Sequence, residues 1–245
     1  MIIEENGIPQ VKRAREFKLY TYDGRILLDL YRGDGRAFSG YKPGKTVFTL
    51  KNLAEQGVFC DYPSVYGGRL QKALLSLFPE FPHTAVFASE ASALNFLPQM
   101  PADPARGESG SFVLWRPGLP VPSEARQLLV RIPAGGFSRA VAVCGRETLS
   151  AAGETLSAVE AGVLTRAVYD WIALAENGLP TVPEIETVDF VRRGYYLEYK
   201  GPDYRECRFR AAEAGILLPP AAEVPAVLPL SATKGEWGKI RKALG

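Results

Sequence analysis

The sequence predicts an α/β fold, and two observations carry that prediction. Through the middle of the chain, short apolar runs of strand length alternate with longer runs in which apolar residues recur every three or four positions. Near the N-terminus, two runs rich in aromatic and branched residues flank Asp23-Gly24, a dipeptide that favours a hairpin because both positions tolerate positive φ. No internal repeat is visible, and a length of 245 residues is typical of one or two domains.

The first half of the chain is expected to hold a hairpin, two helices and a strand that leads into a third helix. Gly57 and Pro79 end the first two helices, since glycine caps a helix in the left-handed conformation and proline cannot continue one. The expected elements are a hairpin at 17–31, helices at 46–56 and 64–78, a strand at 83–88 and a short helix that begins at Ser89.

The second half begins with a segment rich in Pro, Ala, Gly and Asp at 98–109, which is expected to be a linker or exposed loop. A later helix has Pro202 in its first turn and Gly215 after its end, the usual asymmetry of helix termini. The other expected elements are strands at 111–115, 127–132 and 139–144, an amphipathic helix at 155–177, strands at 187–191 and 195–199, a helix at 202–214, strands at 216–218 and 226–230, and a last helix that begins at Thr233.

The composition excludes several classes of protein. The chain is 23% charged with a formal net charge of +2, so it lacks the concentrated basic face that nucleic acid binding needs. Its most apolar stretch, 211–230, is broken by glutamates and prolines and is not expected to span a membrane.

The opening residues MIIEENG do not resemble a secretory signal, which predicts a cytoplasmic protein. Cys60, Cys144 and Cys207 form no CxxC pair, so we expect neither a disulfide framework nor a metal site.

The two ends of the chain resemble a known family. The C-terminal part reads DYRECRFRAAEAGILLPPAAEVPAVLPLSATKGEWGKIRKAL, and the N-terminal part reads LYTYDGRILLDLYRGDGRAF. They resemble the final subdomain and the opening D-G-x-x-Y-L-D hairpin of class III, glutamate-1-semialdehyde aminomutase-like aminotransferases, which depend on pyridoxal phosphate (PLP). The resemblance implies a truncated type I PLP-transferase-like fold. A small α+β domain would comprise 1–62 and 183–245, and a reduced large, cofactor-type α/β domain would comprise 63–182.

The middle of the chain resembles the cofactor site of that family, in the same order but with a large internal deletion. The segment VYGGRLQKALLSLFPEFPHTAVFASEASALNFL resembles the helix, strand and S-G-T-E-A turn that hold the PLP phosphate, which implies that role for Ser89 and Ser92. LLVRIPAGGFSRAVAV resembles the strand that carries the Schiff-base lysine, with Arg131 at the lysine's position. GETLSAVEAG resembles the turn whose threonine reaches the phosphate of the partner subunit, which implies that role for Thr155.

Two of these four candidate cofactor-binding residues also have purely structural interpretations. Ser89 suits an ordinary helix N-cap, and Arg131 suits a solvated or salt-bridged strand residue. The family's pyridine-binding aspartate has no clear counterpart, because FVLWRPG resembles its strand with Trp115 or Arg116 near its place. Asp103 lies in the expected linker, so we do not expect it at a strand end.

The chain lacks a lysine where the chemistry needs one. No lysine lies between Lys72 and Lys200. PLP catalysis requires a lysine amine that forms the internal aldimine and then moves the proton. Arginine cannot replace it, because its pKa above about 12 keeps it protonated. The remaining source would be a distant lysine, such as Lys42, Lys45 or Lys200. We therefore expect a pseudoenzyme without catalytic residues.

Three hypotheses of function follow. The first is a catalytically inactive, homodimeric binding or regulatory protein whose ligand is noncovalent PLP, another small phosphate or carboxylate, or none. The second is a non-catalytic partner subunit of a full-length aminotransferase. The third is an enzyme of different chemistry on a phosphorylated small molecule, using Arg131 and His83, although His83 also suits a strand edge. We adopt the first.

Overall fold

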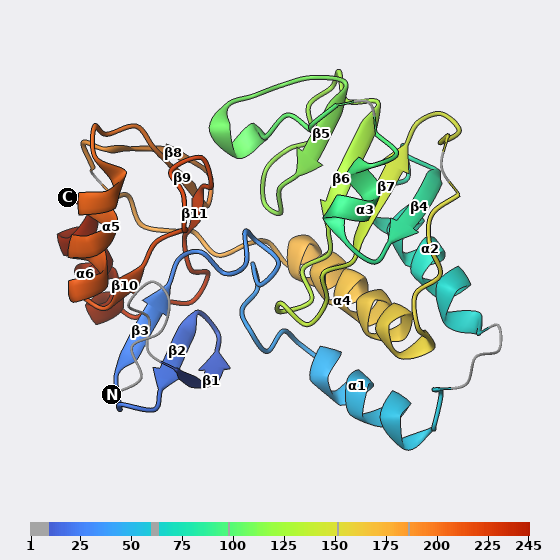
Figure 1. The fold of residues 1–245 in the computed structure, drawn as a ribbon, viewed down its shortest axis with the longest axis horizontal. Coiled ribbons are helices and arrows are strands. Elements are labelled where there is room, and N and C mark those ends of the chain that lie inside the picture. The colour runs from blue at the N-terminus through green and yellow to red at the C-terminus, as the bar shows by residue number, and fades with distance from the viewer. Residues whose placement is uncertain (1–9, 60–63, 98, 151, 186) are drawn as a thin grey trace. The chain divides into compact units, whose positions relative to one another are not determined.

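Strands and helices alternate along the chain (Figure 1). The structure is a computed structural model that describes residues 10–59, 64–97, 99–150, 152–185 and 187–245. The strands are β1 (Val11–Arg15), β2 (Lys18–Thr21), β3 (Ile26–Asp29), β4 (His83–Phe87), β5 (Phe112–Trp115), β6 (Gln127–Arg131), β7 (Val141–Gly145), β8 (Phe190–Arg193), β9 (Tyr196–Tyr199), β10 (Ile216–Leu217) and β11 (Ala226–Val227). The helices are α1 (Thr46–Glu55), α2 (Val65–Leu77), α3 (Glu90–Leu94), the 3-10 helix η2 (Pro104–Arg106), α4 (Ala158–Glu176), α5 (Tyr204–Glu213) and α6 (Lys234–Leu244).

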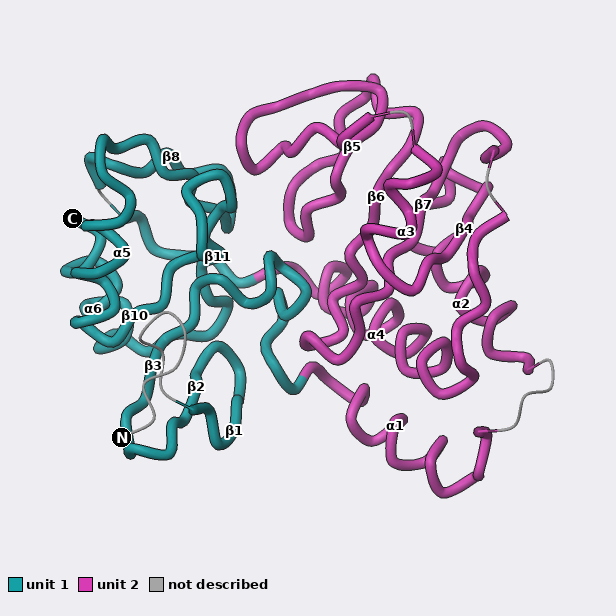
Figure 2. Tube along the Cα trace, viewed as in Figure 1, with its two compact units in different colours: residues 1–42, 180–245 teal, residues 43–179 magenta. Residues whose placement is uncertain are grey.

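Contacts divide the chain into two units (Figure 2). Unit 1 comprises Met1–Lys42 and Pro180–Gly245, and unit 2 comprises Pro43–Leu179. These boundaries differ from the predicted ones at 62/63 and 182/183. The larger difference concerns α1, which belongs to unit 2.

The reason is that α1 packs against α4. The Asp170 carboxylate of α4 accepts a hydrogen bond from the Lys45 N–H (2.9 Å), which caps the start of α1. Gly162 of α4 lets the two helices approach closely, because a Cβ there would lie 2.6 Å from Leu53 Cδ1. Both contacts join residues more than a hundred positions apart, and the local sequence of α1 does not indicate them.

Unit 2 is built on a four-stranded sheet in the order β4-β7-β6-β5. Strand β7 is antiparallel to both neighbours and β5 is parallel to β6, so β4, β5 and β6 all run in the same direction. On one face, Phe87, Leu129 and Val143 share an apolar cluster with Ala93 of α3. On the other, Trp115 meets Trp171 of α4 with ring centroids 5.7 Å apart. Both faces of the sheet are thus buried, as the continuous apolar strands indicate.

Unit 1 combines both parts of the chain that flank unit 2. In one sheet, ordered β1-β2-β3-β10, the C-terminal strand β10 pairs in parallel with β3 of the N-terminal hairpin. The second sheet has the order β11-β9-β8, and the Val227 N–H of β11 donates to the Leu30 carbonyl (2.6 Å). Helices α5 and α6 complete the unit, with Ala211, Trp237 and Ile240 in its apolar core.

The segment expected to be a linker, 98–109, pairs with β5 at Ala102. Ala102 forms a parallel bridge with Val113, and its N–H donates to the Phe112 carbonyl (2.9 Å). Asp103 then caps η2 and is buried. The expectation of an exposed loop is therefore wrong for 101–106, whereas Gln99, Met100 and 107–109 are exposed. This segment covers the edge of β5, whose backbone groups would otherwise be open to further pairing.

The structure also bears on membrane spans, metal sites and the state of the cysteines. Within the described ranges, no helix is long and apolar enough to cross a membrane. In the same ranges, no group of three or more His, Cys, Asp or Glu could hold a metal ion. Cys144 and Cys207 are buried thiols, and burial raises the pKa of the Cys144 thiol to about 12. Cys60 and the opening residues 1–9 lie outside the described residues.

Candidate functional site

The candidate site lies at the carboxyl edge of the unit 2 sheet. Because β4, β5 and β6 run in the same direction, their carboxyl ends meet at this edge, which is where ligands bind in open α/β sheets. Phe87 at the end of β4 and Arg131 at the end of β6 both pair with Val141 of β7. Trp115 pairs with Val130, so Arg116 follows β5 at the level of Arg131.

Ser89 and Ser92 lie together at the start of α3. The Ser89 hydroxyl accepts a hydrogen bond from the Ser92 N–H (3.1 Å), and the Ser92 hydroxyl accepts one from the Ser89 N–H (3.2 Å). This reciprocal arrangement is a capping box, which satisfies two helix-terminal N–H groups with the helix's own side chains. The two serines lie together at the turn where the resemblance implies a phosphate site. Their hydrogen bonds, however, are those of an ordinary helix N-cap.

The Glu154 carboxylate faces the start of α3. Its Oε2 accepts hydrogen bonds from the Ala88 N–H (2.7 Å) and from the Ser92 hydroxyl (3.2 Å). Gly153 makes this approach possible, because its φ is +79° and a Cβ there would lie 2.7 Å from the Val86 carbonyl oxygen. A side chain of the protein thus supplies negative charge where the N–H groups and dipole of a helix start attract an anion.

Arg131 is held by Glu90, the first residue of α3. Its Nε and one terminal nitrogen contact the two carboxylate oxygens of Glu90, each at 2.7 Å. Both side chains are largely shielded, with 14% and 21% exposed respectively. This two-point geometry is the strongest arrangement open to an arginine and a carboxylate, and it fixes the orientation of both groups. The salt-bridged interpretation of Arg131 matches this geometry.

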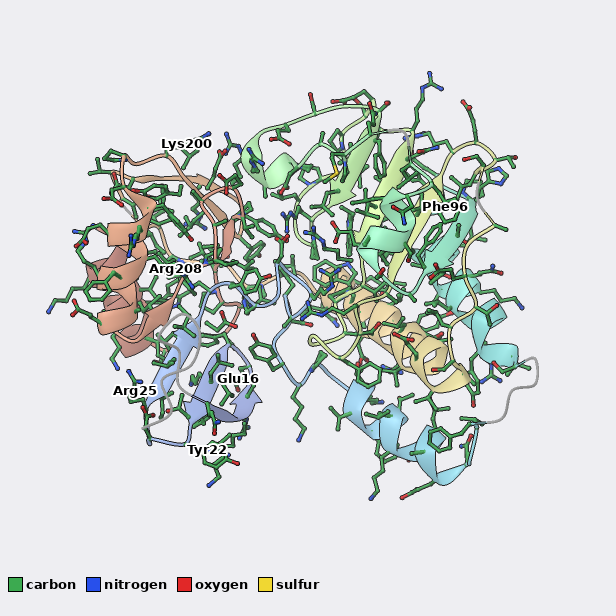
Figure 3. The ribbon with its side chains drawn as sticks, in the orientation of Figure 1. Glu16, Tyr22, Arg25, Phe96, Lys200 and Arg208 are labelled. Atoms are coloured by element: carbon green, nitrogen blue, oxygen red, sulfur yellow. The ribbon has the colours of Figure 1, made fainter. Side chains whose placement is uncertain are left out.

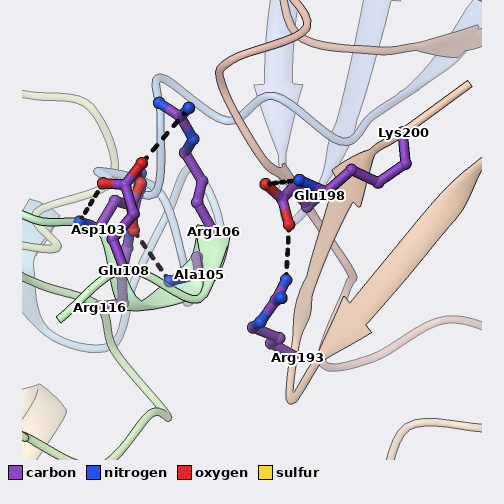
Figure 4. Close-up of polar contacts among 8 residues, drawn as sticks. All are labelled: Asp103, Ala105, Arg106, Glu108, Arg116, Arg193, Glu198 and Lys200. Carbon is purple, nitrogen blue, oxygen red and sulfur yellow. Dashed lines mark hydrogen bonds and ion pairs between the residues drawn. The ribbon is translucent and has the colours of Figure 1, made fainter. Parts of the chain in front are cut away.

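A second arginine at this edge has its own carboxylate partner. Arg116 is buried and donates from Nε to Asp103 Oδ1 (2.9 Å), and a terminal nitrogen contacts the other oxygen. The Asp103 carboxylate also accepts a hydrogen bond from the Ala105 N–H (3.0 Å). The backbone N–H of Asp103 donates to the Glu108 carboxylate (2.9 Å), as Figure 4 shows. Asp103 directly follows the Ala102 bridge and belongs to no strand, yet its carboxylate reaches Arg116 just after the end of β5. Sequence reasoning missed Asp103, Glu90 and Glu154 as members of this site.

Two other residues singled out from the sequence lie apart from these pairs. Thr155 is exposed in the coil before α4, next to Glu154. His83 pairs with Gly145 at the opposite end of β4 from Phe87. The step from His83 to Phe87 is four residues of extended strand, which spans roughly 13 Å. The structure therefore does not bring His83 and Arg131 together. The third hypothesis, an enzyme that uses these two residues on a phosphorylated small molecule, loses its residue pair.

Among the described residues of unit 2, this edge carries two paired arginines and no lysine. Both arginines stay protonated at neutral pH, so neither serves as a base or a nucleophile. The lysines of unit 2 are Lys45, Lys51 and Lys72, which are exposed on or beside α1 and α2. None of them belongs to the carboxyl edge of the sheet.

The fold is similar to that of solved aminotransferases. Ornithine aminotransferase from Plasmodium yoelii matches with a TM-score of 0.67 and 13% identity, over 98% of this chain and 94% of that chain. N-acetylornithine aminotransferase from Stenotrophomonas maltophilia gives 0.64 and 14%, over 98% and 95%. Acetylornithine aminotransferase from Elizabethkingia anophelis gives 0.62 and 14%, over 98% and 95%. At these identities the likeness establishes an aminotransferase-like α/β fold and nothing about activity.

Two curated relatives match parts of the sequence. An uncharacterized protein of Borreliella burgdorferi is 34% identical over 92 residues, which are 38% of this chain and 34% of the relative. An uncharacterized protein of Treponema pallidum is 28% identical over 163 residues, which are 66% of this chain and 52% of the relative. The matched regions span about a third and a half of these relatives. No family profile matches the chain.

Proposed function

We propose that this protein is a catalytically inactive, internally shortened variant of the aminotransferase-like fold that acts by binding, as a homodimer, without PLP. The observation that carries the proposal is the carboxylate-filled edge of the unit 2 sheet. Glu90 engages Arg131, and Glu154 engages the Ala88 N–H and Ser92. Three of the four residues that the resemblance assigns to the cofactor, Ser89, Ser92 and Arg131, are thus bonded to side chains of the protein itself.

PLP does not fit this set of residues. Its phosphate would have to displace the Glu154 carboxylate and would then lie near the second carboxylate, Glu90. Glu154 is exposed but Glu90 is largely shielded, so water only partly screens the repulsion between the phosphate and Glu90. The described residues of unit 2 also supply no lysine at this edge for a Schiff base. These points argue against noncovalent PLP as well as against covalent PLP.

The first test is a titration of the purified protein with PLP, read by absorbance and followed by borohydride reduction and peptide mapping. We expect no saturable band, because no lysine lies between Lys72 and Lys200 and the edge is filled by carboxylates. Any reduced adducts should map to exposed lysines outside that interval, and should form to the same extent in urea-unfolded protein. A saturable adduct at one lysine that requires the folded chain would refute the proposal.

The homodimer part of the proposal rests on the helical layer of unit 2. Helices α1 and α2 both pack against α4, and all three present large apolar side chains to solvent. Phe48 and Val65 are 64% and 63% exposed, and Val47, Leu75 and Tyr169 are also exposed. Apolar surface of this kind marks interfaces between proteins, and two-fold self-association is the commonest way to bury it.

The second test is sedimentation velocity on the native chain and on charged variants. We expect the native chain to sediment as a dimer, and Phe48→Glu and Val65→Glu to shift it to the monomer, because each would bury a carboxylate against apolar surface. Tyr22→Glu is the matched control, since Tyr22 is equally exposed but lies in the β2–β3 turn of unit 1 (Figure 3). A monomeric native chain, or a dimer that tolerates both unit 2 variants, would contradict this interface.

A further inference from the structure

We propose that unit 2 holds a second site, at the amino edge of its sheet, that binds a small carboxylate with an aromatic or branched apolar body. The site is a hollow of about 410 Å³. Its size falls within the range of small-molecule pockets, which are mostly apolar with a few polar groups that orient the ligand. The hollow is lined by Leu77, Phe78, Pro79, Glu80, Phe81, Val121, Pro122, Ser123 and Arg146.

Three elements form this hollow. The end of α2 continues into the turn at 78–81, the loop at 121–123 lies between β5 and β6, and Arg146 directly follows β7. Gly145, the last residue of β7, pairs with His83 and with Gln127, the first residues of β4 and β6. The hollow is therefore at the opposite edge of the sheet from Arg131 and Glu90, and the proposal is independent of the proposed function.

Arg146 is the only cation in the lining, and it is fixed from two sides. Its Nε donates to the Ala125 carbonyl (2.9 Å), and its guanidinium carbon lies 4.8 Å from the centre of the Phe81 ring. The stacking on Phe81 is a cation–π contact, which holds the planar group against the wall of the hollow. With these two contacts in place, the guanidinium keeps its orientation whichever carboxylate it faces.

The carboxylate that now faces Arg146 is the exposed side chain of Glu80. Its Oε2 lies 2.6 Å from a terminal nitrogen of Arg146, yet the Glu80 side chain is 68% exposed. An exposed ion pair contributes little to stability, because water solvates the separated charges well. Glu80 can therefore turn into solvent at small cost and leave the guanidinium to a ligand carboxylate. The ligand's apolar body would then lie against Phe78, Val121 and Pro122.

A neighbouring hollow extends the apolar surface. It has a volume of about 370 Å³ and shares Leu77, Phe78 and Val121 with the first. Its further lining includes Trp115 and Trp171, and the Trp115 ring meets the Phe78 ring edge-on with centroids 5.2 Å apart. Two tryptophans so close to the site favour a ligand with an aromatic or branched body. They also provide a fluorescence signal for its binding.

The experiment is calorimetric titration of the full chain with phenylacetate, and with phenylacetamide as its neutral isostere, with tryptophan fluorescence as second readout. We expect phenylacetate to bind with a dissociation constant on the order of 1 mM, which is well within the affinity that a ligand of its size can reach. Phenylacetamide should bind at least tenfold more weakly. Glu80→Gln should tighten phenylacetate binding severalfold because it removes the competing carboxylate, and Arg146→Gln should weaken it tenfold or more.

Two further variants separate this site from a general effect on the fold. Val121→Trp fills the hollow and should abolish binding while Arg146 stays in place. Arg126→Gln is the matched control, because Arg126 forms an ion pair with Glu147 (3.0 Å) that is more exposed and lies outside the hollow, so the affinity should stay unchanged. The proposal fails if the amide binds as well as the carboxylate, if Glu80→Gln and Arg146→Gln leave the affinity unchanged, or if no saturable binding occurs.

Discussion

Replacing Arg116 by methionine is expected to lower the free energy of unfolding by about 3–5 kcal/mol, because it leaves the Asp103 carboxylate buried without its cation. The two side chains are only 3% and 10% exposed, and they meet through two hydrogen bonds. Methionine keeps most of the length and apolar stem of arginine, so the change isolates the lost charge. Urea unfolding, followed by tryptophan fluorescence, measures the effect, since Trp115 directly precedes the substituted residue.

Two further variants distinguish lost charge from lost packing. The double variant Asp103→Asn with Arg116→Met should recover most of the stability, because the asparagine is neutral and its side-chain oxygen still accepts the Ala105 N–H. Arg126→Met is the surface control, expected to change stability by less than about 1 kcal/mol. If Arg116→Met and the double variant were equally destabilised, the loss would come from packing, and the charge argument would be wrong.

Replacing Arg32 by methionine is expected to destabilise unit 1 by at least about 3 kcal/mol, since three buried carbonyl groups lose their donor. The guanidinium donates to the carbonyls of Phe38 (2.7 Å), Val227 (2.8 Å) and Leu228 (2.6 Å). The side chain is 1% exposed, and burial lowers the pKa of Arg32 to about 10 despite the opposing charge of Asp29. The contacts join the loop after β3 to the C-terminal part of the chain. Hydrogen exchange in unit 1, together with urea unfolding, measures the loss.

The controls for Arg32 are a conservative change and an exposed arginine. Arg32→Lys should recover only part of the stability, because a single ammonium group lacks the planar fork that serves three carbonyls at once. Arg25→Met, in the β2–β3 turn, should leave the unfolding midpoint unchanged. Should Arg32→Met behave like Arg25→Met, the carbonyls of Val227 and Leu228 would have other donors, and Arg32 would not be the link between the two parts.

The sequence predicted much of the fold because most elements are specified by nearby residues. The capping box at Thr233 and Glu236 opens α6 as expected, and Ser89 caps α3. The helix expected at 202–214 is α5, although its N-cap is Asp203, so Pro202 lies just before the helix. These features depend on side chains within three or four positions of one another, which a sequence displays directly.

Only part of the candidate site was predictable, because the carboxylates that bond its residues are distant from them in the sequence. Ser89, Ser92 and Arg131 are at or near the carboxyl edge of the sheet, where the resemblance implied a cofactor site. The carboxylates that engage this edge were not foreseen, since Glu90 lies 41 residues from Arg131 and Glu154 lies 62 from Ser92. Composition likewise suggested an exposed loop around Asp103, where Ala102 forms a parallel bridge with β5.

The sequence by itself determined the α/β class, the order of the elements and the absence of lysine between Lys72 and Lys200, so that interval supplies no amine for a Schiff base. Only the tertiary structure decided which partner each shielded arginine bonds. Arg131 meets Glu90, Arg116 meets Asp103 and Arg32 meets carbonyls 195 and 196 residues away. The physical reason is that helix and turn preferences act over a few residues, whereas a buried cation must find its partner wherever the packed chain brings one.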